Sequence, residues 1–157
     1  MKYTLSVLVE NHFGVLARIS GLFSARGFNI SSLSVAETED ETVSVMTIVV
    51  DGDDRIADQV KKQLNKLIEV IKVRDLTEQE YVSRELALVK VDAEASKRSE
   101  ILQISEVFKG RVVDISHETV TLEVTGNTSK IDAIINLLKP YGIKEMARTG
   151  KVALMRG

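Results

Sequence analysis

The stretch ENHFGVLARISGLFSARGFNI, from Glu10 to Ile30, decides the fold of this chain. Residues 3–9 in front of it alternate between two faces, which is the period of a strand with one buried side. Gly27 suits a left-handed helix end, after which a new strand begins. Between these points the apolar residues recur with helical spacing, at Val15, Leu16, Ile19, Leu22 and Phe23. The stretch therefore predicts a strand, a loop, a helix and a second strand.

The loop between the first strand and the helix is a candidate binding site. The first N–H groups of a helix have no intrahelical partner and carry the positive end of its dipole, which suits a carboxylate. A glycine in this loop lets a ligand approach the backbone closely. We interpret the two ends of the element as an amino-acid site made of Asn11, Gly14, Val15, Leu16, Asn29 and Ile30.

Each residue type in this set has a separate predicted role. Backbone N–H groups from Gly14 to Leu16 hold the carboxylate of the bound amino acid, and the amide oxygens of Asn11 and Asn29 accept hydrogen bonds from its ammonium group. The apolar side chains line the pocket for its side chain. Two simpler interpretations stay open at this point: Asn11 caps the helix, and Asn29 is an ordinary turn residue.

The rest of the first half completes a ferredoxin-like order of elements. Strands at 30–37 and 42–50 form a hairpin, a helix follows with its apolar stripe at 56–67, and a strand closes the half at 70–76. Both helices then cover one face of the sheet. We expect the other face to carry Ser44, Met46, Ile48 and Val50 and to be covered by another copy or by the second half.

The same six elements recur in the second half. Strands are predicted at 86–92, 111–116, 119–125 and from 143, and helices at 96–109, ended by Gly110, and after Asn127. The fold class is therefore α+β, with two ferredoxin-like βαββαβ domains at 1–76 and 85–157, joined by a polar linker at 77–84. The second half has no glycine in the loop 92–96, so it keeps the scaffold without the candidate site and suits partner docking or dimer stabilisation.

Composition excludes several classes of function. The 157 residues include no Cys and only two His, which excludes disulfides and thiol catalysis and argues against a metal site. A net charge of −2 and 4% aromatic residues argue against nucleic-acid binding, and no apolar run reaches the roughly 20 residues of a membrane span. With no secretory signal pattern, we expect a cytoplasmic protein.

An enzymatic function lacks the necessary residues. We find no nucleophile paired with a base and no phosphate-binding glycine loop, so the sequence predicts a protein without catalytic residues of its own. RNA-recognition domains share this order of elements, but they stack bases on aromatic residues of the central strands. The corresponding strands here offer only Tyr3.

Several segments resemble the small regulatory subunit of acetolactate (acetohydroxyacid) synthase, which has an N-terminal ACT domain. They are 5–11 (LSVLVEN), 14–16 (GVL), 21–30 (GLFSARGFNI) and the tail segments 147–150 (ARTG), 153–154 (AL) and 156–157 (RG). The resemblance implies a non-catalytic subunit that binds and activates the large catalytic subunit. It also implies feedback inhibition by valine or a related branched-chain amino acid, with thiamine diphosphate, Mg and FAD bound only by the large subunit.

The resemblance further implies a homodimer in which two ACT domains lie side by side. The effector sites then lie at the interface, with Asn11, Gly14, Val15 and Leu16 from one chain and Asn29 and Ile30 from its partner. The main alternative is an ACT-type amino-acid sensor that regulates a different enzyme or a transcription factor.

Overall fold

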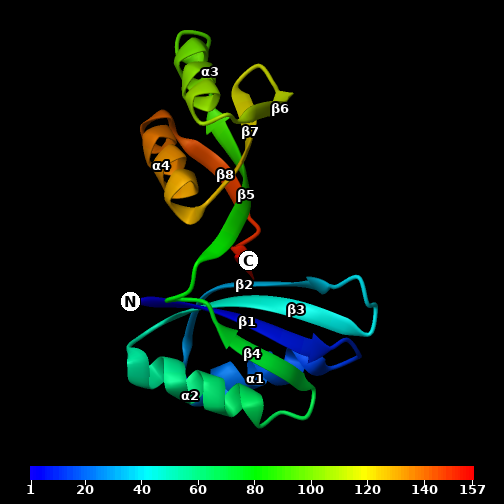
Figure 1. Ribbon diagram of the computed structural model, residues 1–157. Coiled ribbons are helices and arrows are strands. Elements are labelled where there is room, and N and C mark those ends of the chain that lie inside the picture. Colours follow the sequence, from blue (N-terminus) through cyan, green and yellow to red (C-terminus); the bar gives the residue numbers. More distant parts are fainter. The chain divides into compact units, whose positions relative to one another are not determined.

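A computed structural model describes residues 1–157 and confirms the predicted α+β class. The first half contains β1 (Lys2–Glu10), α1 (Val15–Arg26), β2 (Asn29–Glu37), β3 (Val43–Asp51), α2 (Asp54–Asn65) and β4 (Val70–Asp75). Its antiparallel sheet has the order β2-β3-β1-β4. Figure 1 shows α1 and α2 on the same face of this sheet, which is the ferredoxin-like arrangement.

The core of this half lies between the sheet and its two helices. Because side chains alternate along a strand, β1 buries every second residue against the helices. Each helix contributes residues from one stripe. The buried set is Leu5, Val7, Val9, Val15, Ile19, Phe23, Met46, Ile48, Val50, Val60 and Leu64.

The ends of the helices follow local chemistry. Gly27 takes a left-handed conformation with φ of 66°, and the N–H of Phe28 donates to the carbonyl of Phe23, so this end is a glycine cap as predicted. At the start of α2, the side chain of Asp53 accepts a hydrogen bond from the backbone N–H of Ile56 at 2.9 Å.

The predicted faces of the third strand are wrong. Ile48 lies opposite Leu5 and Met46 lies opposite Val7 in the β1–β3 register, so both side chains point into the helix-covered core. The other face carries Thr47 and Val49, which are also buried. Periodicity could not separate the two faces because both are apolar enough to be buried, whereas strand register does so directly.

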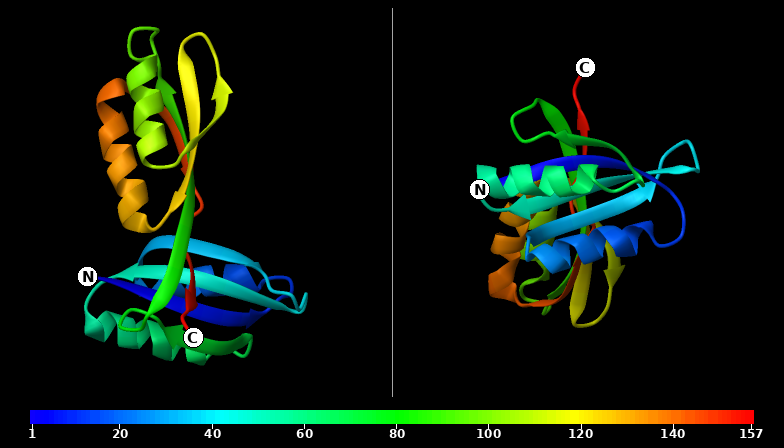
Figure 2. Two further views of the ribbon diagram at one scale, coloured as in Figure 1. Left: turned by 45° about the horizontal axis from the view of Figure 1, so that its top comes forward. Right: turned by 90° about the horizontal axis from the view of Figure 1, so that it is seen from below.

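The second half repeats the topology. It contains β5 (Tyr81–Asp92), α3 (Arg98–Val107), β6 (Arg111–Ile115), β7 (Thr119–Gly126), α4 (Thr128–Leu138), the short 3₁₀ helix η1 (Lys139–Tyr141), β8 (Ile143–Arg148) and β9 (Val152–Met155). The sheet order is β6-β7-β5-β8, and β9 also pairs with β5. Figure 2 shows α3 and α4 side by side on one face of that sheet. None of the four α-helices is long and apolar enough to cross a membrane.

The end of α3 differs from the prediction. The helix stops at Val107, and Lys109, rather than Gly110, takes the left-handed conformation, with φ of 55°. Gly110 is needed for a different reason. A Cβ at this position would lie 2.9 Å from the Oγ of Ser105 and 3.2 Å from the carbonyl oxygen of Glu123, so the chain passes too close for a larger residue.

The chain divides into two compact units at positions that differ from the predicted boundaries. The first unit is Met1–Val82 together with Lys151–Gly157, and the second unit is Ser83–Gly150. The predicted C-terminal domain at 85–157 includes the tail. Instead, the Lys151 Nζ donates to the Oγ1 of Thr4 at 3.1 Å, and the N–H of Arg156 donates to the carbonyl of Glu80 at 2.9 Å. The predicted linker is also shorter, because β5 already begins at Tyr81.

Substitutions in β9 test the assignment of the tail. Ala153 is buried and its neighbour Leu154 is 74% exposed. We expect Ala153→Asp to lower the free energy of unfolding by about 2 kcal/mol because it buries a carboxylate, and Leu154→Asp to change it by less than about 0.5 kcal/mol. Urea unfolding followed by circular dichroism measures both. Equal effects of the two variants would contradict the assignment.

Candidate amino-acid site

The helix α1 begins without a side-chain cap. Gly14 is its N-cap residue in a left-handed conformation, with φ of 87° and ψ of −8°, and no side chain accepts from the first turn. The N–H of Arg18 is the first to bond back into the helix, to the Gly14 carbonyl at 3.0 Å. The N–H of Val15, one of the predicted carboxylate donors, instead donates to the carbonyl of His12 at 3.4 Å. The N–H groups of Leu16 and Ala17 have no acceptor, so this helix start is open to an anion.

Gly14 is required by its backbone conformation. A Cβ added there would meet no atom within 4 Å, so space in the protomer does not demand glycine. The positive φ does, since L-residues other than Asn and Asp seldom adopt it. The same open space leaves the backbone accessible from outside.

Asn11 does not cap the helix, so the simpler interpretation of this residue is wrong. Its Nδ2 donates to the carbonyl of Glu41 at 2.8 Å, and its backbone N–H donates to the carbonyl of Thr42 at 2.7 Å. These two bonds fix the side chain against the β2–β3 turn. The Oδ1 of Asn11 accepts no hydrogen bond within the first unit and remains available to a donor.

The β2–β3 turn is a further part of the site, because Asn11 bonds to it. The carboxylate of Asp40 accepts from the N–H of Thr42 at 3.0 Å and from its hydroxyl at 2.7 Å. These two bonds hold the pKa of Asp40 below its usual value. The spacing Thr38-x-Asp40-x-Thr42 is typical of side-chain-stabilised turns and was the available signal.

The predicted apolar residues fall into different environments. Val15 is buried in the core, so its side chain points away from the open helix start. Leu16 is 43% exposed, and Ile30 is half-buried against the edge of the same core. Of the three, Leu16 is the most accessible to a ligand at the loop.

Asn29 and Ile30 lie far from the loop within one protomer. Asn29 pairs with Asp51 of β3, which pairs with Lys2 at the beginning of β1, whereas Asn11 follows the end of β1. Eight residues of strand separate the two ends, about 26 Å at roughly 3.3 Å per residue. The structure therefore does not bring Asn11 and Asn29 together in a single chain. Asn29 is exposed, and its side chain makes no hydrogen bond in the first unit.

Charged groups surround the outside of the loop. His12 Nε2 lies 3.0 Å from Glu10 Oε2, and this hydrogen bond raises the pKa of His12 above its usual value. Arg18 of the first helical turn pairs with Glu69, a carboxylate from the residue before β4. The site is thus flanked by ion pairs that do not occupy the open N–H groups.

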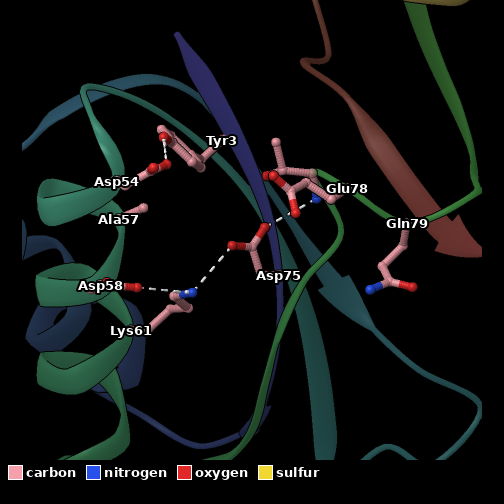
Figure 3. A pocket seen from close by; sticks show the side chains of 9 residues that line it. Tyr3, Asp54, Ala57, Asp58, Lys61, Asp75, Glu78 and Gln79 are labelled. Atoms are coloured by element: carbon pink, nitrogen blue, oxygen red, sulfur yellow. Dashed lines mark hydrogen bonds and ion pairs between the residues drawn. The ribbon is translucent and has the colours of Figure 1, made fainter.

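Two other hollows differ in character from the loop. The first, of about 370 Å³, lies between α2 and the end of β4 (Figure 3). Lys61 lies between Asp58 at 3.3 Å and Asp75 at 3.2 Å, and Tyr3 donates to Asp54, which raises the pKa of Tyr3 to about 12. Because these groups pair with one another, few are left to bind a ligand.

The second hollow, of about 430 Å³, lies at the equivalent loop of the second unit, beside Asp92, Lys97 and His117. There Arg98 donates to the carbonyls of Ala93, Ser116 and His117, at 2.8 to 3.1 Å. Hydrogen bonds from an arginine side chain thus stabilise this loop. The equivalent loop of the first unit has a left-handed glycine and no such arginine.

Comparison with known proteins identifies the class of protein. Residues 5–72 match the family described as an AHAS small subunit-like ACT domain, and residues 84–157 match the family described as the small subunit of acetolactate synthase. The first unit is therefore an ACT domain, which confirms that part of the resemblance.

Relatives cover the full chain. The chain is 56% identical over 157 residues to a probable acetolactate synthase small subunit of Archaeoglobus fulgidus, covering 100% of this chain and 98% of that protein. It is 55% identical to the acetolactate synthase small subunit of Aquifex aeolicus, and the match covers 99% of this chain and 81% of that protein. The crystal structure of the acetolactate synthase small subunit from Thermotoga maritima superposes with a TM-score of 0.90 at 42% identity, and the match covers 100% of this chain and 98% of that one. The chain belongs to the acetolactate synthase small subunit family.

The pair of His12 and Glu10 gives a prediction on pH. Because the folded pKa of His12 is raised, its stabilising contribution is present below pH of about 6.5 and is lost as the pH rises through the folded pKa. NMR titration of the imidazole should give a pKa above 6.5 that falls in Glu10→Gln and is unchanged in Glu41→Gln, an exposed carboxylate outside this pair. An equal fall in both variants would refute the pairing.

Proposed function

We propose that the chain is the non-catalytic regulatory subunit of acetolactate synthase. It binds and activates the large catalytic subunit and makes it sensitive to feedback inhibition by valine or a related branched-chain amino acid. Thiamine diphosphate, Mg and FAD bind the large subunit only. The observation that carries the effector site is the uncapped start of α1, where Gly14 leaves the N–H groups of Leu16 and Ala17 open.

The effector is recognised through both of its charged groups. Its carboxylate accepts from the open N–H groups of α1, where the helix dipole contributes about 0.3 to 2 kcal/mol. This is too little for binding by itself. The ammonium group donates to the Oδ1 of Asn11, and the exposed side chain of Leu16 contacts the aliphatic part of the effector.

The complete site forms between two copies of the chain. β2 is an edge strand that pairs only with β3, so its outer backbone groups are free to add a strand. Antiparallel pairing of β2 with β2 about a twofold axis sets the Asn29 end of one strand beside the Glu37 end of the other. The Glu37 end lies at the same end of the sheet as the loop after β1, because Glu37 pairs with Ser44 and Glu10 with Val43.

A site between two chains also suits regulation. An effector shifts an equilibrium only when it binds one state more tightly than the other. A ligand that contacts Asn11 of one chain and Asn29 of its partner binds only when the two chains hold one particular arrangement. Effector binding therefore favours that arrangement of the dimer, and the large subunit responds to it.

Reconstitution tests the proposal as a whole. The purified chain should raise the activity of an acetolactate synthase large subunit, and valine, leucine or isoleucine should lower the activity of the complex. Failure to bind that large subunit in a pull-down would instead favour a sensor for a different enzyme or a transcription factor.

A substitution at Gly14 separates effector binding from activation. Gly14→Asp places a carboxylate beside that of the effector, and we expect it to weaken the response to valine at least about tenfold while leaving activation intact. Gly14→Asn is the matched control, because Asn also tolerates positive φ and has nearly the same shape without the charge. It should retain a clearly stronger response to valine. Equal responses of the two variants would contradict the placement of the effector carboxylate.

Mixing two inactive variants tests whether the site spans two chains. Asn11→Ala and Asn29→Ala should each abolish valine binding measured by calorimetry. After the two are unfolded and refolded together, a heterodimer holds one site with both changes and one intact site, so about a quarter of the sites should bind valine again. No recovery, with heterodimers detected by mass spectrometry, would contradict a site shared between two chains.

A further inference from the structure

Glu69 has an unusual environment for a carboxylate. It is 8% exposed, whereas its neighbour Ile68 is 88% exposed. The hydrophobic effect alone favours the opposite placement of these two residues. The Oε2 of Glu69 is buried and has no hydrogen-bond partner, which adds a further cost. The position of Glu69 is therefore maintained by specific contacts of the rest of the residue.

Those contacts hold both ends of the loop that precedes α1. The backbone carbonyl of Glu69 accepts from the N–H of Glu10, the last residue of β1, at 2.8 Å. Its Oε1 accepts from Nη1 of Arg18 in the first turns of α1. Glu69 thus contacts both elements that flank this four-residue loop, the end of β1 and the beginning of α1.

We propose that Glu69 is the positioning residue of the effector site. It fixes the direction of the first turn of α1 relative to the sheet, and hence the direction of the open N–H groups of Leu16 and Ala17. This inference rests on the proposed function. Asn11 ties the other side of the same loop to the β2–β3 turn, so the two contacts together hold a loop that contains a flexible glycine.

A preorganised site binds more tightly because less freedom is lost on binding. Loss of the Glu69 charge weakens its bond to Arg18, since charge-assisted hydrogen bonds are stronger than neutral ones. The loop then samples more directions before the effector binds. Glu69 itself does not touch the effector, so the effect passes entirely through the position of α1.

The test variant is Glu69→Gln, which keeps the shape and one acceptor oxygen. In the full chain we expect calorimetry to show L-valine affinity lower by about fivefold. Arg18→Met should give a similar loss, and the double variant should lose no more than either single one. The ¹⁵N order parameters of residues 11–17 should fall in Glu69→Gln.

The ion pair of Lys61 and Asp75 provides a matched control (Figure 3). It lies in the same unit at 3.2 Å, and Asp75 pairs with Leu5, several residues away from the loop along β1. We expect Asp75→Asn and Glu69→Gln to lower the midpoint of thermal unfolding by similar amounts. In Asp75→Asn, L-valine affinity and the order parameters of the loop should stay at wild-type values.

The outcomes separate this inference from the proposed function. If wild type binds L-valine and Glu69→Gln binds it equally well, the positioning role is overturned. A similar loss of affinity in Asp75→Asn also overturns it, because the effect is then one of general stability. If wild type binds none of L-valine, L-leucine and L-isoleucine, the proposed function fails. The order parameters then decide alone, and unchanged values in Glu69→Gln overturn the role.

Discussion

The left-handed backbone of Gly14 is the constraint on which the site depends. It turns the chain directly from the end of β1 into α1 without a capping side chain, so two N–H groups of the first turn stay open. A serine or aspartate cap would have filled this position from within the protein. The surrounding contacts of Asn11 and Glu69 hold the loop without using those groups. The left-handed glycine therefore leaves N–H groups open for a ligand, and it also makes the loop depend on the contacts of Asn11 and Glu69.

The sheet topology determines how such a helix start can be used. In the order β2-β3-β1-β4, the loop after β1 and the start of β2 lie at opposite ends of the sheet. The edge position of β2 offers a way to join them between two copies. The second unit repeats the fold, but Arg98 bonds to the carbonyls of its equivalent loop. The helix α3 also starts without a side-chain cap, so the left-handed glycine before α1 is what distinguishes the first unit.

Local patterns were sufficient for the elements, and tertiary contacts decided the rest. Helical spacing and glycine predicted α1 and its end at Gly27, and alternation predicted the strands. Register could not be read where both faces of β3 are apolar, which is why Met46 was placed on the wrong side. The return of the tail to the first unit rests on contacts such as that of Lys151 with Thr4, more than a hundred residues apart. Hydrophobicity predicts a buried Ile68 and an exposed Glu69, and the structure shows the opposite.

The most direct test is an NMR titration of the ¹⁵N-labelled chain with L-valine and with L-valinamide, which keeps the ammonium group and lacks the carboxylate. The account predicts saturable shifts of the Leu16 and Ala17 amide signals with L-valine, and at most weak, unsaturated shifts with L-valinamide. Binding of L-valine that leaves these two signals unmoved would contradict it.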